Sequence, residues 1–140
     1  MRAMPLADAA STPDPLAPSP ATPKRGAVVV TCMDARIDPL AVLGLALGDA
    51  HVLRNAGAVV TDDVLRSIAL SQRVFATRTV YVMAHTDCGV RAAGLISELD
   101  EHVRRAAGRI RRHTALPYRD DVRGCVLDVE TGAVRMVDGA

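Results

Sequence analysis

Two short segments of the sequence bring together thiol, imidazole and charged side chains. The first, at residues 31–36, reads Thr-Cys-Met-Asp-Ala-Arg and contains Cys32, and the second, at residues 85–89, reads His-Thr-Asp-Cys-Gly and contains His85 and Cys88. Zinc accepts sulfur and nitrogen ligands, and catalytic zinc sites keep three protein ligands with one position open. Any one of these residues alone would be interpreted as a buried structural side chain, but the three together favour a metal site.

A carboxylate and a guanidinium follow the first thiol. Asp34 and Arg36 are two residues apart, so their side chains can point the same way. An Arg side chain can grip a carboxylate through two parallel hydrogen bonds and so fix its direction. The alternative is an ordinary surface ion pair worth under about 1 kcal/mol, but the position next to Cys32 favours a role at the metal.

Strands and helices must position these segments. A short β-branched run at residues 27–30 is typical of a strand buried on both faces, and two further strands are expected at 51–53 and 79–84. Helices are expected at 38–48, after a cap at Thr61 with a buried face that includes Ile68 and Ala69, and at 97–113. Two strands are expected to follow at 125–129 and 133–137. This order predicts an α/β fold with a central, mainly parallel β-sheet flanked by helices and a C-terminal antiparallel hairpin. Sites gather at the carboxyl ends of strands in such sheets, and both segments follow a strand directly.

Composition and charge exclude several classes of function. The 140 residues fit one domain, and 17 Lys and Arg nearly balance 16 Asp and Glu, so charge singles out neither nucleic acid nor a membrane as partner. Three cysteines are a poor basis for a disulfide framework, and no apolar run approaches the roughly 20 residues of a membrane span. We therefore expect a cytoplasmic protein. Cys125 lies within an apolar strand run and is interpreted as a structural residue.

The two ends of the chain differ in composition. Residues 1–25 contain six of the eight prolines, spaced through small and polar residues. Such a segment cannot bury enough apolar surface to offset the entropy of ordering it, so a flexible tail is predicted there. The folded domain is expected to cover residues 26–140.

Three motifs occur in a fixed order along the chain. They are Cys32-x-Asp34-x-Arg36, then Arg54-Asn55-Ala56-Gly57, then His85-x-x-Cys88-Gly89. In this order and spacing the sequence resembles the β-class carbonic anhydrases, and the first and third motifs are similar to those of the short bacterial and archaeal branch. The similarity runs from about Val28 to Gly89 and resumes at residues 123–137.

The resemblance implies an activity and a cofactor. It implies reversible hydration of carbon dioxide to bicarbonate by a zinc-bound hydroxide, with Zn²⁺ held by Cys32, His85 and Cys88. It further implies that Arg36 holds Asp34 off the metal, so that water can occupy the fourth position. In some members this pair opens and the carboxylate becomes a fourth ligand, which gives an inactive state.

The resemblance also implies which residues lie near the substrate and the metal, and which partners the chain binds. Ala56 and Gly57 match the small residues that let substrate approach the zinc. Asp87 and Gly89 lie in the family's metal loop, where roles in supporting the ligands are expected. The partners implied are the small-molecule substrate and further copies of the chain, as a homodimer or higher homo-oligomer, with no nucleic acid and no membrane.

The sequence departs from the family in two places. Family members usually begin with helices that wrap around a partner subunit, and the Pro-rich tail stands there instead. The stretch from Val90 to Leu99, between the metal loop and the next helix, is shorter than in the family. Both parts normally contribute to the dimer interface or to the pocket wall.

Other functions are open from the sequence. The same chemistry could act on carbonyl sulfide or carbon disulfide, which are linear like carbon dioxide. A non-catalytic zinc module would use Asp34 as a permanent fourth ligand, although such a site has no need of Arg36. Nucleic-acid binding is disfavoured because the arginines of the last helix spread around it and mix with acidic residues, as in a solvated face. These arginines are Arg104, Arg105, Arg109, Arg111 and Arg112. A dinucleotide site is disfavoured because no glycine fingerprint follows the first strand.

Overall fold

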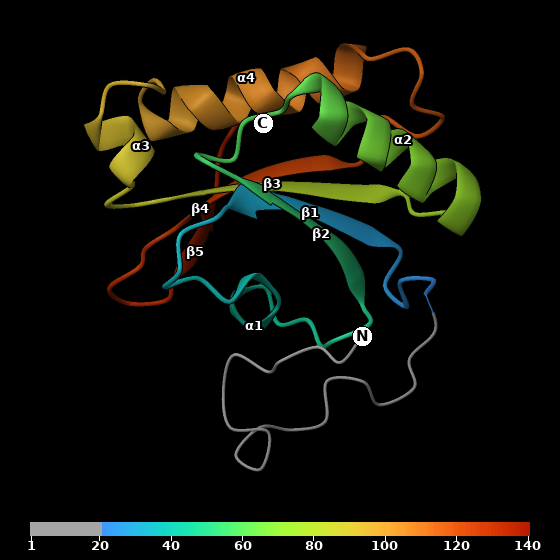
Figure 1. Cartoon of the computed structure of the whole chain (residues 1–140), viewed down its shortest axis with the longest axis horizontal. Helices are drawn as coiled ribbons and strands as arrows, with labels where there is room; N and C mark the ends of the chain where they lie inside the picture. Colours follow the sequence, from blue (N-terminus) through green and yellow to red (C-terminus); the bar gives the residue numbers. More distant parts are fainter. Residues whose placement is uncertain (1–20) are drawn as a thin grey trace, which may run out of the picture.

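A computed structural model describes residues 21–140 and shows a five-stranded sheet with helices on both of its faces (Figure 1). The strands are β1 (Ala27–Cys32), β2 (Ala50–Asn55), β3 (Thr79–His85), β4 (Val122–Leu127) and β5 (Val134–Met136). The helices are α1 (Pro39–Val42), α2 (Asp62–Phe75), α3 (Gly89–Ala92) and α4 (Leu99–Arg112). The predicted flexible tail at residues 1–25 lies mostly outside the described residues, and the domain boundary at residue 26 stays a prediction.

Strand pairing places β1 and β3 side by side in the parallel part of the sheet. The strand order is β2-β1-β3-β4-β5, with β1 parallel to β2 and β3, β3 parallel to β4, and β4 antiparallel to β5. In the β1–β3 register Thr31 lies opposite Met83, so the carboxyl ends of the two strands are neighbours. The predicted mainly parallel sheet with an antiparallel C-terminal hairpin is confirmed.

The sheet is buried between two unequal layers. All six residues of β1 are buried, which explains why this strand is apolar without alternation. On one face, strand residues pack against α2 and α4 in a cluster that includes Val28, Val30, Val82, Ile68 and Ile110. On the other face, a smaller cluster of Ile37, Met83, Cys125 and Leu127 packs against Val42 and Leu43 at the end of α1. Figure 1 shows α2 and α4 together on one side and α1 alone on the other.

Local signals set the ends of the two long helices. The Thr61 hydroxyl accepts a hydrogen bond from the Val64 amide at 3.2 Å, which caps α2 as predicted. The helix ends at Phe75, and the residue that follows it, Ala76, has a left-handed conformation with φ 57°. The predicted apolar stripe of α4 is buried, and consists of Leu99, Val103, Ala107 and Ile110.

The helix α1 is shorter than predicted. It begins where expected, because the Asp38 side chain accepts a hydrogen bond from the Ala41 amide at 3.2 Å. It ends at Val42, however, instead of continuing to residue 48, since Gly44 adopts φ +69° and turns the chain. The short helix α3 was not predicted, because four residues are too few to form a periodic apolar pattern.

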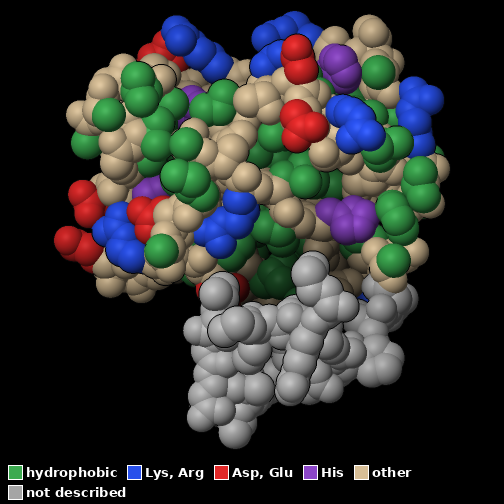
Figure 2. All heavy atoms as spheres, viewed as in Figure 1, with side chains coloured by type: hydrophobic (Ala, Val, Ile, Leu, Met, Phe, Trp, Pro, Cys, Tyr) green, Lys and Arg blue, Asp and Glu red, His purple; other side chains and the backbone are tan. Residues whose placement is uncertain are grey.

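Charged side chains of both signs are interspersed on the face of the molecule shown in Figure 2. Four of the five α4 arginines are bonded to other groups of the chain: Arg104 to the Asp138 carbonyl, Arg105 to Glu101, Arg109 to Asp62 and Arg111 to the Val122 carbonyl. This arrangement favours a solvated face over a nucleic-acid site, whose absence stays a prediction. Among residues 21–140, no helix combines the length and the apolar character needed to cross a membrane.

Contact between β4 and α4 predicts opposite effects for two glycine substitutions. A Cβ atom on Gly124 would collide with Val103 and Ala140, so Gly124→Ala should lower the free energy of unfolding by about 1–3 kcal/mol. Gly108 lies within α4, and a Cβ there meets only the flexible end of Arg112. Gly108→Ala should therefore raise the free energy of unfolding by about 0.5–1 kcal/mol. Urea denaturation of both variants measures the difference, and equal effects would contradict this packing.

Candidate metal centre

The ends of β1 and β3 bring the three predicted ligands together. Cys32 is the last residue of β1, His85 is the last residue of β3, and Cys88 lies directly before α3. One ligand atom from each, the two sulfurs and a ring nitrogen, lie within 4.8 Å of one another. All three side chains are buried, with His85 only 1% exposed. Such a cluster of two thiols and one imidazole could hold a metal ion.

The hydrogen bonds of His85 and Cys32 fit a metal. The Thr86 carbonyl lies 2.7 Å from His85 Nδ1, and a carbonyl can only accept, so Nδ1 carries the proton and a neutral ring leaves Nε2 without one. His85 Nε2 is buried without a hydrogen-bond partner among the described residues, which is costly unless an ion satisfies it. The Gly57 amide donates a hydrogen bond to Cys32 Sγ at 3.4 Å, which helps to fix the position of this sulfur.

Asp34 and Arg36 form the predicted pair beside this cluster. The guanidinium donates from Nε to Asp34 Oδ1 at 3.0 Å and from its terminal nitrogen to Oδ2 at 2.7 Å. These bonds, together with one from the Arg36 amide, hold the pKa of the Asp34 carboxyl well below its usual range. Asp34 Oδ2 also lies 3.8 Å from His85 Nε2, so the carboxylate stands next to the ligand cluster.

A second arginine fixes the loop after β1. Arg54, on β2, donates from Nε to the Cys32 carbonyl and from its terminal nitrogen to the Asp34 carbonyl, both at 2.8 Å. Because charge-assisted hydrogen bonds are strong, Arg54 holds the backbone on both sides of Met33. The sequence marked Arg54 only as part of a motif, and the strand register that brings it beside Cys32 was needed to find this contact.

The loop at Ala56 and Gly57 lies against the same site. Gly57 has φ +91°, a conformation that favours glycine, and a Cβ there would also be in tight contact with the Val90 side chain at 3.1 Å. The buried His102 of α4 bonds through Nε2 to the carbonyls of Gly57 at 2.8 Å and Ala58 at 3.1 Å. His102 thus supports the loop whose amide contacts Cys32. No local sequence signal indicated this contact, because the residues are 45 positions apart.

Cys125, the third cysteine, stands apart from the cluster. It lies in β4, is fully buried and packs with Met83 and Leu127. Burial raises the pKa of its thiol to about 11, so it stays protonated at neutral pH. This placement agrees with the structural interpretation.

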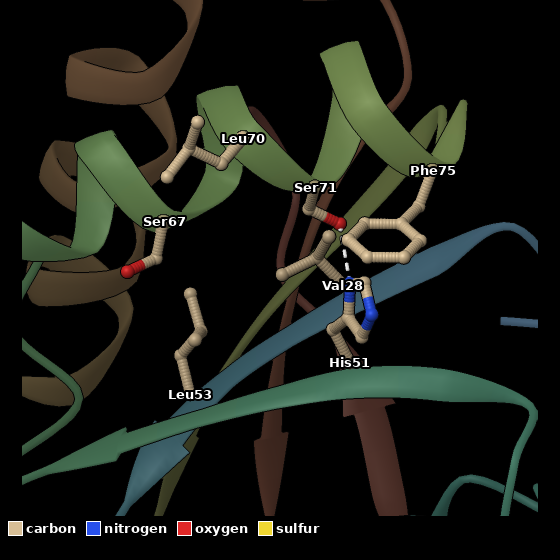
Figure 3. A pocket seen from close by; sticks show the side chains of 7 residues that line it. All are labelled: Val28, His51, Leu53, Ser67, Leu70, Ser71 and Phe75. Carbon is tan, nitrogen blue, oxygen red and sulfur yellow. Dashed lines mark hydrogen bonds between the residues drawn. The ribbon is translucent and has the colours of Figure 1, made fainter. Parts of the chain in front are cut away.

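A separate hollow of about 200 Å³ lies between β2 and α2 (Figure 3). It is lined by Val28, His51, Leu53, Ser67, Leu70, Ser71 and Phe75. His51 lies 2.7 Å from the Ser71 hydroxyl through Nδ1 and 3.3 Å from the Ala21 carbonyl through Nε2, so both ring nitrogens are engaged. Figure 3 shows the His51 ring beside the Phe75 ring, and the two meet edge to face at 5.0 Å. The hollow is therefore apolar, with a satisfied histidine at its edge.

The fold and this site define an α/β protein of the metalloenzyme type, with two thiols, an imidazole and an Asp–Arg pair at the carboxyl edge of a parallel sheet. A family model described as carbonic anhydrase matches residues 27–122, and the chain belongs to the β-carbonic anhydrase family. It is 39% identical to beta-carbonic anhydrase 1 of Mycobacterium tuberculosis over 141 residues, which cover 86% of each protein.

Solved structures and further relatives agree with this assignment. The crystal structure of a carbonic anhydrase from Streptococcus mutans is 37% identical and superposes with a TM-score of 0.76 over 84% of each chain. A carbon disulfide hydrolase of Saccharolobus solfataricus is 47% identical over 62 residues, which cover 44% of this chain and 30% of that protein. The family thus includes proteins named for two different substrates.

The alignment with the mycobacterial relative also bears on chain length. It extends over 141 positions, whereas 86% of this 140-residue chain is about 120 residues, so about 20 aligned positions face gaps in this chain. The chain is therefore about 20 residues shorter than this relative within the aligned region, and the location of the shortening after the metal loop stays a prediction.

The three cysteines allow a matched test of the metal site. We expect the purified chain to take up about one zinc ion, and Cys88→Ala to weaken zinc affinity at least about 100-fold because one of three ligands is lost. Cys125→Ala removes an equally buried thiol outside the cluster and should leave the affinity unchanged. Competition with a chromophoric chelator measures both. Equal losses in the two variants would show that Cys88 is not a ligand.

Proposed function

We propose that this chain catalyses the reversible hydration of carbon dioxide to bicarbonate, with Zn²⁺ held by Cys32, His85 and Cys88. The observation that carries the proposal is the position of Asp34. It is held by Arg36 and lies 3.8 Å from His85 Nε2, which has no hydrogen-bond partner among residues 21–140. A structural zinc site has no use for a carboxylate restrained in this way. Membership of the β-carbonic anhydrase family supports the same reaction.

The ion and Asp34 have separate tasks in this proposal. Zinc, when bound, lowers the pKa of a coordinated water to about 7, so that a nucleophile is available at neutral pH. Asp34 stays ionised at that pH because its pKa is depressed, and it is therefore too weak a base to store the proton. Its task is to accept a hydrogen bond at Oδ2 and orient the nucleophile. The reaction adds water to carbon dioxide and gives bicarbonate and one proton, which leaves to buffer.

The surrounding loops keep this arrangement fixed. Arg36 occupies both carboxylate oxygens of Asp34, and Arg54 holds the carbonyls of Cys32 and Asp34. The small residues Ala56 and Gly57 leave room for a linear substrate. Because these groups are placed before substrate arrives, little reorganisation is needed during the reaction.

A second candidate is hydrolysis of carbon disulfide or carbonyl sulfide. It is favoured by the 47% identity over 62 residues to a carbon disulfide hydrolase. The same Asp34 and ligand set would serve, and only the shape of the substrate path would differ. Release of hydrogen sulfide from carbon disulfide, measured on the same preparation, separates this activity from hydration.

We also propose that the protein is a cytoplasmic homodimer or higher homo-oligomer. The oligomeric state is measured by light scattering after size-exclusion chromatography of the zinc-loaded chain. A monomer that retains full activity would contradict this part of the proposal.

A matched pair of carboxylates tests the role of Asp34. Asp34→Ala should lower the rate of carbon dioxide hydration by about 100-fold or more, because the group that orients the nucleophile is lost. Asp121 is a suitable control, since Arg123, also two residues on, donates to it through Nε at 2.9 Å and a terminal nitrogen at 3.3 Å. Stopped-flow measurement with a pH indicator should show that Asp121→Ala keeps full activity.

Two outcomes would oppose the proposed function. If the zinc-loaded protein does not hydrate carbon dioxide between pH 7 and 9, the proposed reaction is wrong. The site then acts on a different substrate or is not catalytic. Equal losses in Asp34→Ala and Asp121→Ala would show that the Asp34 pair is an ordinary surface feature.

A further inference from the structure

We propose that Asp87 is a positioning residue that anchors Arg36 and thereby keeps Asp34 away from the metal position. This inference deepens the proposed function and rests on it for its effect on turnover. Asp87 lies in the loop between two of the proposed ligands, His85 and Cys88. It therefore connects the ligand loop with the pair that follows β1.

Arg36 is bonded to two carboxylates through different edges of its guanidinium. Its Nε and one terminal nitrogen face Asp34, at 3.0 and 2.7 Å. The other terminal nitrogen, Nη1, donates to Asp87 Oδ2 at 2.9 Å. The terminal nitrogen that bonds Asp34, Nη2, also donates to the Asp87 carbonyl at 3.0 Å. A guanidinium has five N–H groups, so these four bonds do not compete for the same hydrogen. Asp87 is thus a second anchor for Arg36 and does not draw it away from Asp34.

The backbone of Asp87 makes this double contact possible. Its φ is +52°, in the left-handed region that few residues other than Gly, Asn and Asp adopt. In this conformation both its carbonyl and its carboxylate reach the guanidinium of Arg36. The two residues are 51 positions apart in the sequence, so the contact ties two separate loops together.

Loss of this anchor should act on Asp34. Arg36 is 47% exposed, so without the Asp87 carboxylate it keeps only the residue 87 carbonyl on that side and exchanges its bonds to Asp34 for bonds to water more often. A released Asp34 is close to the ligand cluster, since its Oδ2 lies 3.8 Å from His85 Nε2. Asp87 would therefore bias the carboxylate toward Arg36 and away from the ion. Because Asp87 is itself 80% exposed, its removal should leave global stability unchanged.

Two substitutions separate the charge of Asp87 from its backbone conformation. Asp87→Asn retains an acceptor oxygen and tolerates the left-handed conformation, and Asp87→Gly retains the conformation but removes the side chain. The control is Glu101→Gln, which removes an exposed carboxylate bonded to Arg105 at 2.5 Å, outside the site. All are prepared as the zinc-loaded full chain.

The first measurement follows Arg36 directly. The Nε–H signal of Arg36 is identified in ¹⁵N spectra by its loss in Arg36→Lys, and its exchange with solvent is measured. We expect exchange to be about two- to fivefold faster in Asp87→Gly, the range for an exposed ion pair, with a smaller change in Asp87→Asn. Exchange that is unchanged or slower than in Glu101→Gln would overturn the inference. This readout is independent of turnover, so it decides the role of Asp87 even if the protein does not hydrate carbon dioxide.

The second measurement asks whether Asp87 acts through Asp34. The visible absorption of the cobalt-substituted protein depends on the ligands of the ion, and we expect it to change in Asp87→Gly as Asp34 is released. The same substitution in an Asp34→Ala background should produce no change, because no carboxylate remains to be released. A spectral change of equal size in both backgrounds would overturn the inference. In an active enzyme, kcat for hydration should fall about two- to fivefold in Asp87→Gly, in parallel with the exchange rate.

Discussion

Parallel pairing of β1 with β3 is the constraint on which the candidate site depends. Cys32 ends one strand and His85 ends the other, and the register between them places both ends at the same edge of the sheet. A shift of one residue would turn every side chain of a strand to the opposite face. The apolar cluster against α2 and α4 opposes such a shift, because it buries Val28, Val30 and Val82. Core packing therefore fixes the distance between the proposed ligands Cys32 and His85.

Beyond the strand ends, side chains rather than regular structure hold the site. The loops after β1 and β3 are held largely by hydrogen bonds from guanidinium groups. Arg54 binds two carbonyls of the first loop, and Arg36 joins this loop to Asp87 of the second. His102 supports a third loop from α4 through the Gly57 carbonyl. Each contact crosses between elements that are distant in sequence, so the geometry of the site reflects the whole fold.

The difference between local signals and contacts between distant elements explains what the sequence could predict. The buried strand β1, the cap at Thr61 and the apolar stripe of α4 are local signals, and the structure confirms them. The grouping of Cys32 with His85 and Cys88 was predicted because sites occur at strand ends and because the motifs resemble a known family. The predicted length of α1 was wrong because Gly44 turns the chain before the apolar pattern in the sequence ends. The contacts of Arg54 and His102 depend on strand register and helix packing, which no local pattern contains.

The two Asp–Arg pairs show how position gives a motif its chemistry. In both, the arginine follows the aspartate by two residues and donates to its two oxygens. Asp121 precedes β4, at the amino edge of the sheet, where it also accepts a hydrogen bond from the Thr79 hydroxyl at 2.8 Å. Asp34 lies at the carboxyl edge, beside a buried imidazole nitrogen that has no hydrogen-bond partner in the described part of the chain. Both carboxylates have lowered pKa values, with the bonded arginine as the main cause, so electrostatics alone does not distinguish them. The strand end at which each pair stands decides which one can take part in chemistry.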